Sequence, residues 1–219
     1  WRWRLLFKQM EFVGVKSIFI VVLTGTFTGM VFALQSRYAF ELFNANYLIG
    51  PTVVLGLTRE LGPVLASLMV TARAGSAMAA ELGTMRVTEQ IDALETMAVN
   101  PVQYLLVPRL FAGVTMVPLL TALFSFCGTI GCYLVTVYLI GVNPNVFWNE
   151  ILTLVDLSDL WNGLIKACFF GMTLALIGCH KGFNSAGGAE GVGQATTQAV
   201  VLASVSILIS DYFLTALLF

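Results

Sequence analysis

Five long apolar stretches dominate the hydrophobic pattern of this 219-residue chain. Each is about as long as the ~20 helical residues that cross a bilayer core of ~30 Å. Polar connections of very different length separate these stretches. The pattern therefore predicts five membrane-spanning helices, at residues 17–36, 47–72, 110–140, 160–179 and 191–210, the last continuing past Asp211 towards Phe219.

Composition supports the same class of protein. Hydrophobic residues make up 58% of the chain and charged residues 11%, and the mean hydropathy is +0.88. A soluble domain carries about 25% charged residues. We therefore predict an all-α integral membrane protein. No basic stripe indicates nucleic-acid binding, and neither the four cysteines nor His180 have metal-ligand spacing, so no metal site is expected.

Basic residues give the predicted orientation. They flank the first span and lie in the connection 73–109, whereas the connection 141–159 carries only acidic residues. The positive-inside rule then places the N-terminus and the connection 73–109 in the cytoplasm and the C-terminus outside. Residues 1–12 alternate bulky apolar and cationic side chains, which fits either an interfacial helix or a basic flank that only orients the first span. Because the chain begins with Trp1 rather than methionine, we expect further residues to precede it.

Three charged residues interrupt the predicted spans. Arg59 and Glu60 lie in the second span and Lys166 lies in the fourth. Glu60 precedes Arg73 by thirteen positions, or roughly 20 Å of helix, and Lys166 precedes Lys181 by fifteen, or roughly 22 Å. The two charges are thus expected at similar height in the outer half of the bilayer.

Ionised groups at such depth are costly and usually mark a cavity, a partner or a transport path. Neighbouring residues point about 100° apart on a helix, so Arg59 and Glu60 face each other poorly. We hypothesise that Glu60 pairs with Lys166 and that Arg59 faces a cavity that admits anionic groups. The alternative is an ion pair that only locks two helices together.

Small and aromatic residues add two further expectations. Gly25 and Gly29 have the spacing that lets helix backbones approach closely, either within one chain or across a dimer. Phe27, Phe32, Phe40 and Phe43 lie along the first span and its outer end, where they could line an acyl-chain cavity or simply face lipid.

The long connection 73–109 contains the pattern of an amphipathic helix. Thr88 can cap a helix over residues 88–99 that the Asn100–Pro101 step ends. Ile91, Leu94 and Ala98 share one face of this helix, and the acidic residues Glu89, Asp92 and Glu95 lie largely on another. Acidic side chains are unfavourable against anionic headgroups, so docking to a protein is the preferred interpretation over an interfacial helix.

No nucleotide-binding or hydrolytic motif is present. The chain has no GxxxxGK[ST], GxSxG or HExxH sequence, and the glycine-rich stretch 182–193 has no P-loop lysine. We therefore expect a non-catalytic subunit that moves an amphipathic or anionic molecule, without a cofactor of its own.

Residues 57–109 carry a specific resemblance. The RELGP, RAGSAMAAELGTM and TEQIDALETMAVNP motifs, with GMVFALQ at 29–35 and NGLIKA around Lys166, resemble the permease subunits of the MlaE type. The resemblance extends over nearly the whole chain. It implies one permease domain, with an interfacial segment (1–12), two spans (13–72), a cytoplasmic coupling region (73–109) and three further spans (110–219).

The family also implies function and partners. Two permease copies would form a homodimer, and a P-loop ATPase that binds ATP and Mg²⁺ would dock on Glu89, Asp92, Leu94 and Glu95. A STAS-domain protein, a periplasmic hexameric MCE-domain protein and phospholipid complete the expected system, which maintains outer-membrane lipid asymmetry in the Gram-negative envelope from the inner membrane. Arg59, Glu60 and Lys166 match polar residues of the family's lipid cavity. A proton-coupled transporter that uses Glu60, or a non-transporting scaffold, remains an alternative.

Overall fold

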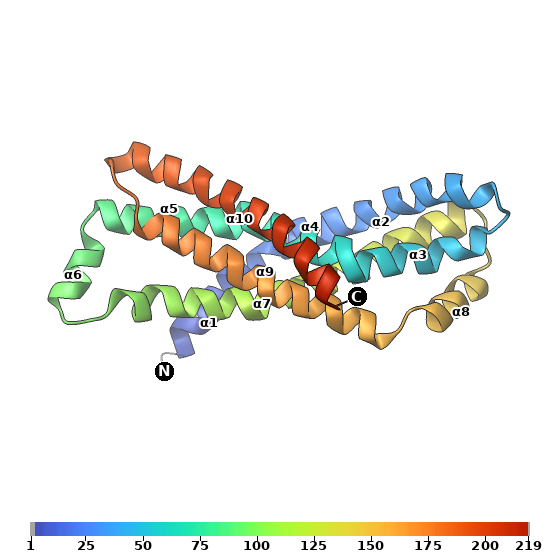
Figure 1. Ribbon diagram of the computed structural model, residues 1–219, viewed down its shortest axis with the longest axis horizontal. Coiled ribbons are helices and arrows are strands. Elements are labelled where there is room, and N and C mark those ends of the chain that lie inside the picture. The colour runs from blue at the N-terminus through green and yellow to red at the C-terminus, as the bar shows by residue number, and fades with distance from the viewer. Residues whose placement is uncertain (1–2, 219) are drawn as a thin grey trace.

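Long antiparallel helices form an elongated bundle in the computed structural model, which describes residues 3–218 (Figure 1). Within this range there is no β-strand, and five helical segments are long and apolar enough to cross a membrane. These segments are Trp3–Glu41, Asn46–Val87, Val102–Leu139, Leu157–Phe183 and Gly188–Leu218. The prediction of an all-α membrane protein with five spans is confirmed.

The first segment is broken near its start. It comprises α1 (Trp3–Val13), a 3₁₀ turn (Val15–Ser17) and α2 (Ile18–Glu41). The Ser17 hydroxyl donates to the Val13 carbonyl across the break. Arg73 of the second segment donates to the Ser17 hydroxyl over 2.8 Å and also to the Phe12 carbonyl. The break is thus held by a cation from a neighbouring helix.

The second segment is longer than expected. It comprises η2 (Asn46–Leu48), α3 (Ile49–Gly56), a π-helical turn η3 (Leu57–Leu61), α4 (Gly62–Val70), a second π turn η4 (Thr71–Gly75) and α5 (Ser76–Val87). The helix continues past residue 72, where the predicted span ends, as far as Val87. Residues beyond position 72 keep a buried apolar face, which sustains the helix: Ala74, Met78, Ala79 and Leu82. Arg73 therefore does not mark a helix end, and the membrane depth of Glu60 stays a prediction.

The connection between the second and third segments is short. Its helix α6 covers Gln90–Thr96 rather than 88–99, and it starts after Glu89 in a left-handed conformation (φ 58°). Thr88 is not the cap, because its hydroxyl donates to the Thr84 carbonyl of the preceding helix. A π turn, η5 (Val102–Leu106), leads directly into α7 (Val107–Tyr133) and the π turn η6 (Leu134–Leu139).

Arg109 lies inside the bundle rather than on a polar connection. It is 4% exposed and bonds to the Met78 carbonyl over 3.2 Å and to Glu81 over 2.9 Å. Its guanidinium joins α7, which begins at Val107, to α5.

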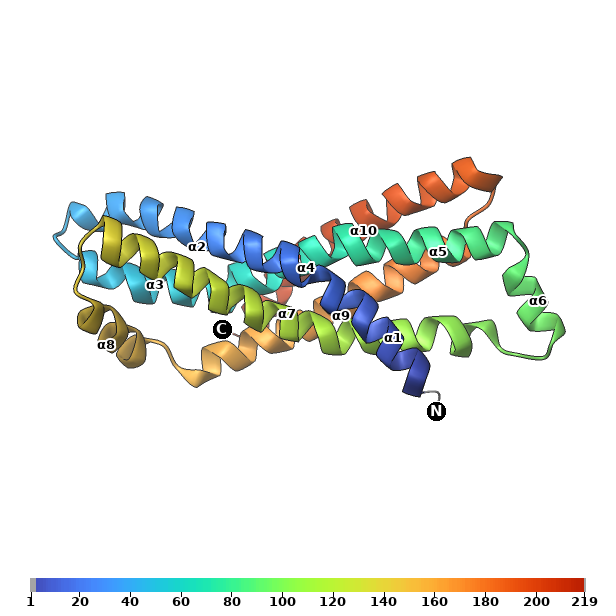
Figure 2. The ribbon, with the colours of Figure 1, turned by 180° about the vertical axis from the view of Figure 1, so that it is seen from behind.

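The remaining helices are α8 (Pro144–Leu154), α9 (Leu157–Phe183) and α10 (Gly188–Leu218). We expected an Asn-rich loop at 141–159, but α8 forms there because Asn143 caps it and Pro144 occupies its first turn. Asp156 and Asp159 form a capping box at the start of α9. Helix α10 ends near the middle of the long axis, while α6 and α8 lie at opposite ends (Figures 1 and 2).

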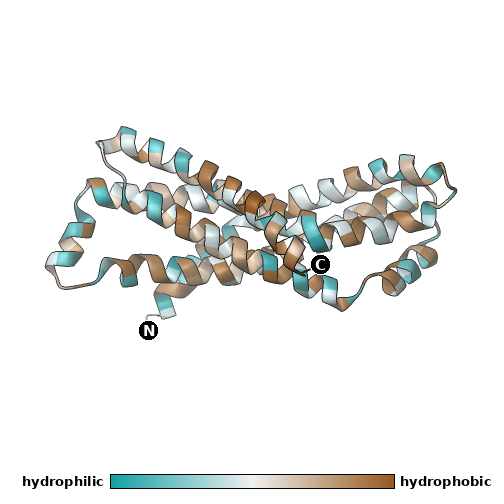
Figure 3. Ribbon diagram, viewed as in Figure 1, coloured by the Kyte–Doolittle hydropathy of each residue, from teal (hydrophilic) through white to brown (hydrophobic). Residues whose placement is uncertain are grey.

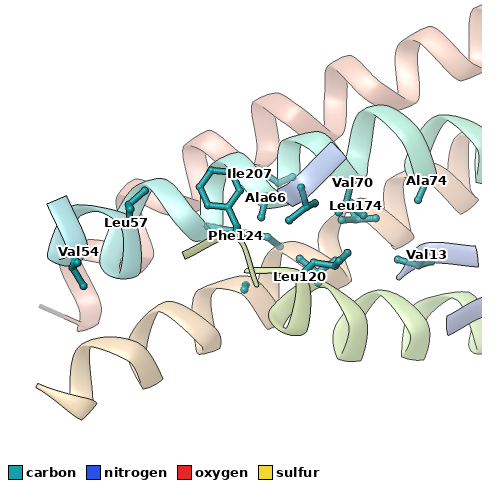
Figure 4. Packing of buried hydrophobic residues seen from close by; sticks show 14 of the residues in the cluster. Val13, Val54, Leu57, Ala66, Val70, Ala74, Leu120, Phe124, Leu174 and Ile207 are labelled. Atoms are coloured by element: carbon teal, nitrogen blue, oxygen red, sulfur yellow. The ribbon is translucent and has the colours of Figure 1, made fainter. Parts of the chain in front are cut away.

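Glycines allow the closest helix contacts. A Cβ atom on Gly29 would lie 1.9 Å from the carbonyl oxygen of Gly128, and one on Gly131 would lie 2.2 Å from that of Thr26. Helix α2 therefore packs backbone to backbone against α7, which confirms that the glycine spacing serves packing within the chain. The adjoining apolar core joins α3, α4, α7, α9 and α10 (Figure 4).

Hydropathy follows this architecture. Hydrophilic residues gather near α6 and α8, and others lie close to the C-terminus in the middle of the bundle (Figure 3). The central polar residues belong to the membrane-spanning segments, where they would face lipid if they did not face one another. They form the candidate site.

Candidate functional site

Lys166 is the centre of a polar cluster in the middle of the bundle. Its side chain is fully buried and donates to Glu60 over 2.9 Å, to Thr215 over 2.8 Å and to Asp211 over 3.3 Å. The predicted Glu60–Lys166 pair is confirmed. The second carboxylate comes from α10, so three membrane-spanning segments share one ammonium group.

Local backbone geometry explains why Lys166 also reaches the main chain. Pro63 has no N–H to donate to the carbonyl four residues earlier, which belongs to Arg59. Lys166 Nζ donates to that oxygen over 3.2 Å. The carbonyl lies in the π turn η3, a kind of helix irregularity that is frequent at functional sites. Because Pro63 cannot donate to it, the Arg59 carbonyl oxygen can accept a hydrogen bond from Lys166 Nζ.

A close helix crossing brings α9 to this turn. A Cβ atom on Gly163 would lie only 2.1 Å from the Thr58 carbonyl oxygen. Gly163 is one turn before Lys166, so the absence of a side chain there sets the distance between the ammonium group and η3. The cluster depends on this glycine as much as on the charges.

Arg59 forms an ion pair that was not predicted from the sequence. Its guanidinium bonds to Asp159, with Nε 2.9 Å and a terminal nitrogen 2.6 Å from Oδ1. Asp159 is 4% exposed and also accepts from the Asp156 backbone N–H. The Arg59 side chain is 41% exposed, so an incoming anion can reach it, and its place in an anion-binding cavity stays a prediction.

Among residues 3–218, the charges of the cluster do not balance. Two cations, Arg59 and Lys166, face three carboxylates, Glu60, Asp159 and Asp211, and these five side chains have a formal sum of −1. Glu60 is 38% and Asp211 21% exposed at the side chain, whereas Lys166 is fully enclosed. The cluster is therefore open on its acidic side and at Arg59, and its buried lysine is fully paired, as a buried charge requires.

Sequence reasoning missed three members of the cluster. Asp159 was counted as a charge of a loop, and Asp211 and Thr215 were not assigned a role. Asp211 had a usable signal, because an acidic residue in an apolar span usually has a partner. The Thr215 hydroxyl accepts from Lys166 Nζ over 2.8 Å and lies 3.2 Å from the nearer carboxylate oxygen of Glu60, and it gave no signal in the sequence.

The aromatic residues separate into different environments. Phe32 is half-buried and lines a hollow of about 330 Å³ together with Leu61, the residue after Glu60. Phe40 packs against the hydrophobic core, and Phe43 is 79% exposed at the end of α2. Of the predicted aromatic residues, Phe27 and Phe32 thus line this hollow, and contact of the set with an acyl chain stays a prediction. The other lining residues of the hollow are Thr28, Val31 and Gln35.

Helix α6 presents an acidic surface at one end of the bundle. Glu89 and Glu95 are exposed, and Asp92 forms an ion pair with Arg86. Leu94 is partly buried against a small apolar cluster that contains Ile91. Leu94 therefore anchors the helix to the bundle, and the acidic residues form its outer face. Within residues 3–218, no group of three His, Cys, Asp or Glu side chains could hold a metal ion.

The sequence of this chain is similar to those of known proteins over almost its whole length. A family model described as Permease MlaE matches residues 6–217. The chain belongs to the MlaE permease family. This MlaE-family chain is 44% identical to the intermembrane phospholipid transport system permease protein MlaE of Haemophilus influenzae, over 98% of the chain and 83% of that protein.

Two other relatives widen the comparison. A protein of Rickettsia typhi named a probable ABC transporter permease is 45% identical over 98% of this chain and 83% of its own length. The chloroplastic protein TRIGALACTOSYLDIACYLGLYCEROL 1 of Arabidopsis thaliana is 37% identical over 99% of this chain and 62% of its own. Similar sequences therefore occur in bacteria and in a plant.

Proposed function

We propose that this MlaE-family chain is the membrane subunit of an ATP-driven phospholipid transporter in the bacterial inner membrane. It would move lipid between that membrane and a periplasmic MCE-domain carrier and so maintain the lipid asymmetry of the outer membrane. The name of the Haemophilus relative supports the phospholipid substrate. The observation that carries the proposal within this chain is the open Lys166 cluster beside the apolar hollow at Phe32.

The two parts of a phospholipid need different surroundings. Arg59 is the accessible cation of the cluster, and a guanidinium can bind phosphate oxygens in a bidentate manner. Leu61, the residue after Glu60, lines the same hollow as Phe32, and this hollow is apolar enough for an acyl chain. Lys166 holds the three helices around this place, because it bonds to Glu60 and Asp211 from a fully buried position.

The energy source would lie on a partner. This chain has no nucleotide-binding motif, and the name of the Rickettsia relative indicates an ABC transporter. We propose that a cytoplasmic P-loop ATPase, with ATP and Mg²⁺, docks on the exposed acids of α6, and that a STAS-domain protein binds that ATPase. The α6 end then faces the cytoplasm, and the α8 end faces the MCE-domain hexamer. A second copy of this chain would complete a homodimer.

Two other functions fit less well. A proton-coupled secondary transporter would work without an ATPase, and a scaffold would have no use for five charged side chains gathered within membrane-spanning helices. Both alternatives are opposed by the ABC permease name of a relative that is 45% identical.

Lipid occupancy of the purified complex tests the proposal. The complex is isolated in mild detergent and its phospholipid is counted by mass spectrometry for wild type, Arg59→Glu and a matched control, Arg37→Glu. Arg37 pairs with Glu41 near the end of α2 and is not a member of the cluster. We expect Arg59→Glu to lose the bound lipid while the ATPase still co-purifies, and Arg37→Glu to retain both. Unchanged lipid in a folded Arg59→Glu complex would contradict the proposal.

A further inference from the structure

Helix α1 bounds a pair of hollows that are far from the Lys166 cluster. It lies across α7, at the end of the bundle that carries α6 (Figure 2). The first hollow has a volume of about 550 Å³, within the range of small-molecule sites. It is lined mainly by apolar side chains of α1, η5 and the start of α7, among them Leu6, Val107, Pro108 and Phe111.

The second hollow is cationic. It has a volume of about 530 Å³ and is lined by Trp3, Arg4, Leu5, Lys8 and Tyr104. Three of these residues, Trp3, Leu5 and Tyr104, also line the first hollow. The two spaces are therefore neighbours that share a wall, with an apolar compartment on one side and a basic compartment on the other.

The basic compartment has a net positive charge. Arg4 and Lys8 are four residues apart on α1, so they lie on the same face, and both are exposed. Glu11 follows one turn later on the exposed side of α1, and it lines neither hollow. Trp3 and Tyr104 stand between the two compartments, and both residue types are enriched where a membrane meets water.

We propose that these joined hollows bind an anionic phospholipid. Its headgroup phosphate would lie between Arg4 and Lys8, and an acyl chain would follow the apolar compartment to Phe111. A soluble anion would use only the basic part, and a neutral apolar ligand only the other part. A molecule with both is needed to fill the pair. The inference does not rest on the proposed transport function, because none of its residues belongs to the Lys166 cluster.

The site can be located by photolabelling. The full-length chain, purified with its native partners, is placed in nanodiscs of phosphatidylcholine that contain a trace of phosphatidylglycerol with a diazirine in one acyl chain. Mass spectrometry then maps the labelled peptides. We expect label on residues 3–8 and 103–111, and weaker label there when the diazirine is carried by phosphatidylcholine.

Matched variants test the basic compartment and the apolar compartment separately. Arg4→Gln with Lys8→Gln should weaken phosphatidylglycerol binding about 30-fold, whereas Lys16→Gln, outside both hollows, should not. Phe111→Ala should reduce label on α1, whereas Phe126→Ala, exposed elsewhere on the same helix, should leave it unchanged. Equal labelling by both lipids, no effect of the charge variants, or a partner protein's segment filling the hollow in the complex would each overturn the proposal.

Discussion

Exchanging the charges of Glu60 and Lys166 separates a simple ion pair from the three-helix cluster described above. In a simple pair, Glu60→Lys combined with Lys166→Glu would restore the attraction that each single substitution removes. The structure predicts a different result, because Lys166 Nζ also lies 3.3 Å from Asp211. In the exchanged protein a carboxylate at position 166 would face the carboxylate of Asp211.

The size of this effect follows from Coulomb's law. Two unit charges 3.3 Å apart interact by about 5 kcal/mol at an effective dielectric constant of ~20. Solvent reduces this value, since the Asp211 side chain is 21% exposed. Even half of it exceeds the ~1 kcal/mol of a typical single-substitution effect. The double variant should therefore remain unstable, and adding Asp211→Asn should recover stability.

Thermal unfolding in detergent, followed by loss of the monodisperse peak, measures this directly. Four proteins are compared: wild type, Glu60→Lys/Lys166→Glu, the same with Asp211→Asn, and Asp211→Asn alone. We expect the triple variant to melt well above the double. If the double variant already unfolded at the wild-type temperature, and Asp211→Asn added nothing to it, the shared-ammonium description of the site would be refuted.

Two further predictions concern the helix crossing and the outer face of α6. Gly163→Ala should destabilise the protein by about 1–3 kcal/mol, because the new Cβ would lie 2.1 Å from a backbone carbonyl oxygen. Gly193→Ala is the control, because there is open space around Gly193. Equal melting temperatures of the two variants would contradict the close helix crossing at Gly163. Glu89→Lys combined with Glu95→Lys should reduce the amount of ATPase that co-purifies. The control is Glu190→Lys, at an exposed position at the start of α10, and it should not reduce that amount. If the Glu89→Lys/Glu95→Lys variant retained all of its ATPase, the acidic residues of α6 would be excluded as the docking surface.

Much of the fold could be predicted because burial in lipid leaves few choices. Apolar runs of membrane length had to be spans, and Glu60 and Lys166, as charges within such runs, had to find partners. The extension of the second helix to Val87 was missed because its polar residues suggested a connection. The helix persists there because Met78 and Leu82, which recur at helical spacing, are buried.

The site was less predictable than the fold. The pairing of Glu60 with Lys166 follows from two helices, but the position of Asp211 depends on how a third helix crosses them. Asp159 was misjudged because a charge near a predicted helix start is normally solvated. Here it caps α9 and at the same time binds Arg59. Such double use of one carboxylate requires the packed structure and cannot be inferred from spacing.

Transport itself tests the central claim most directly. The complete complex is reconstituted in vesicles with fluorescent phospholipid, and lipid transfer to the soluble domain of the MCE protein is followed with and without ATP, for wild type and for Lys166→Met. We predict ATP-dependent transfer that Lys166→Met abolishes while ATPase co-purification persists. Transfer that ignores ATP, or that proceeds unchanged without Lys166, would contradict the account.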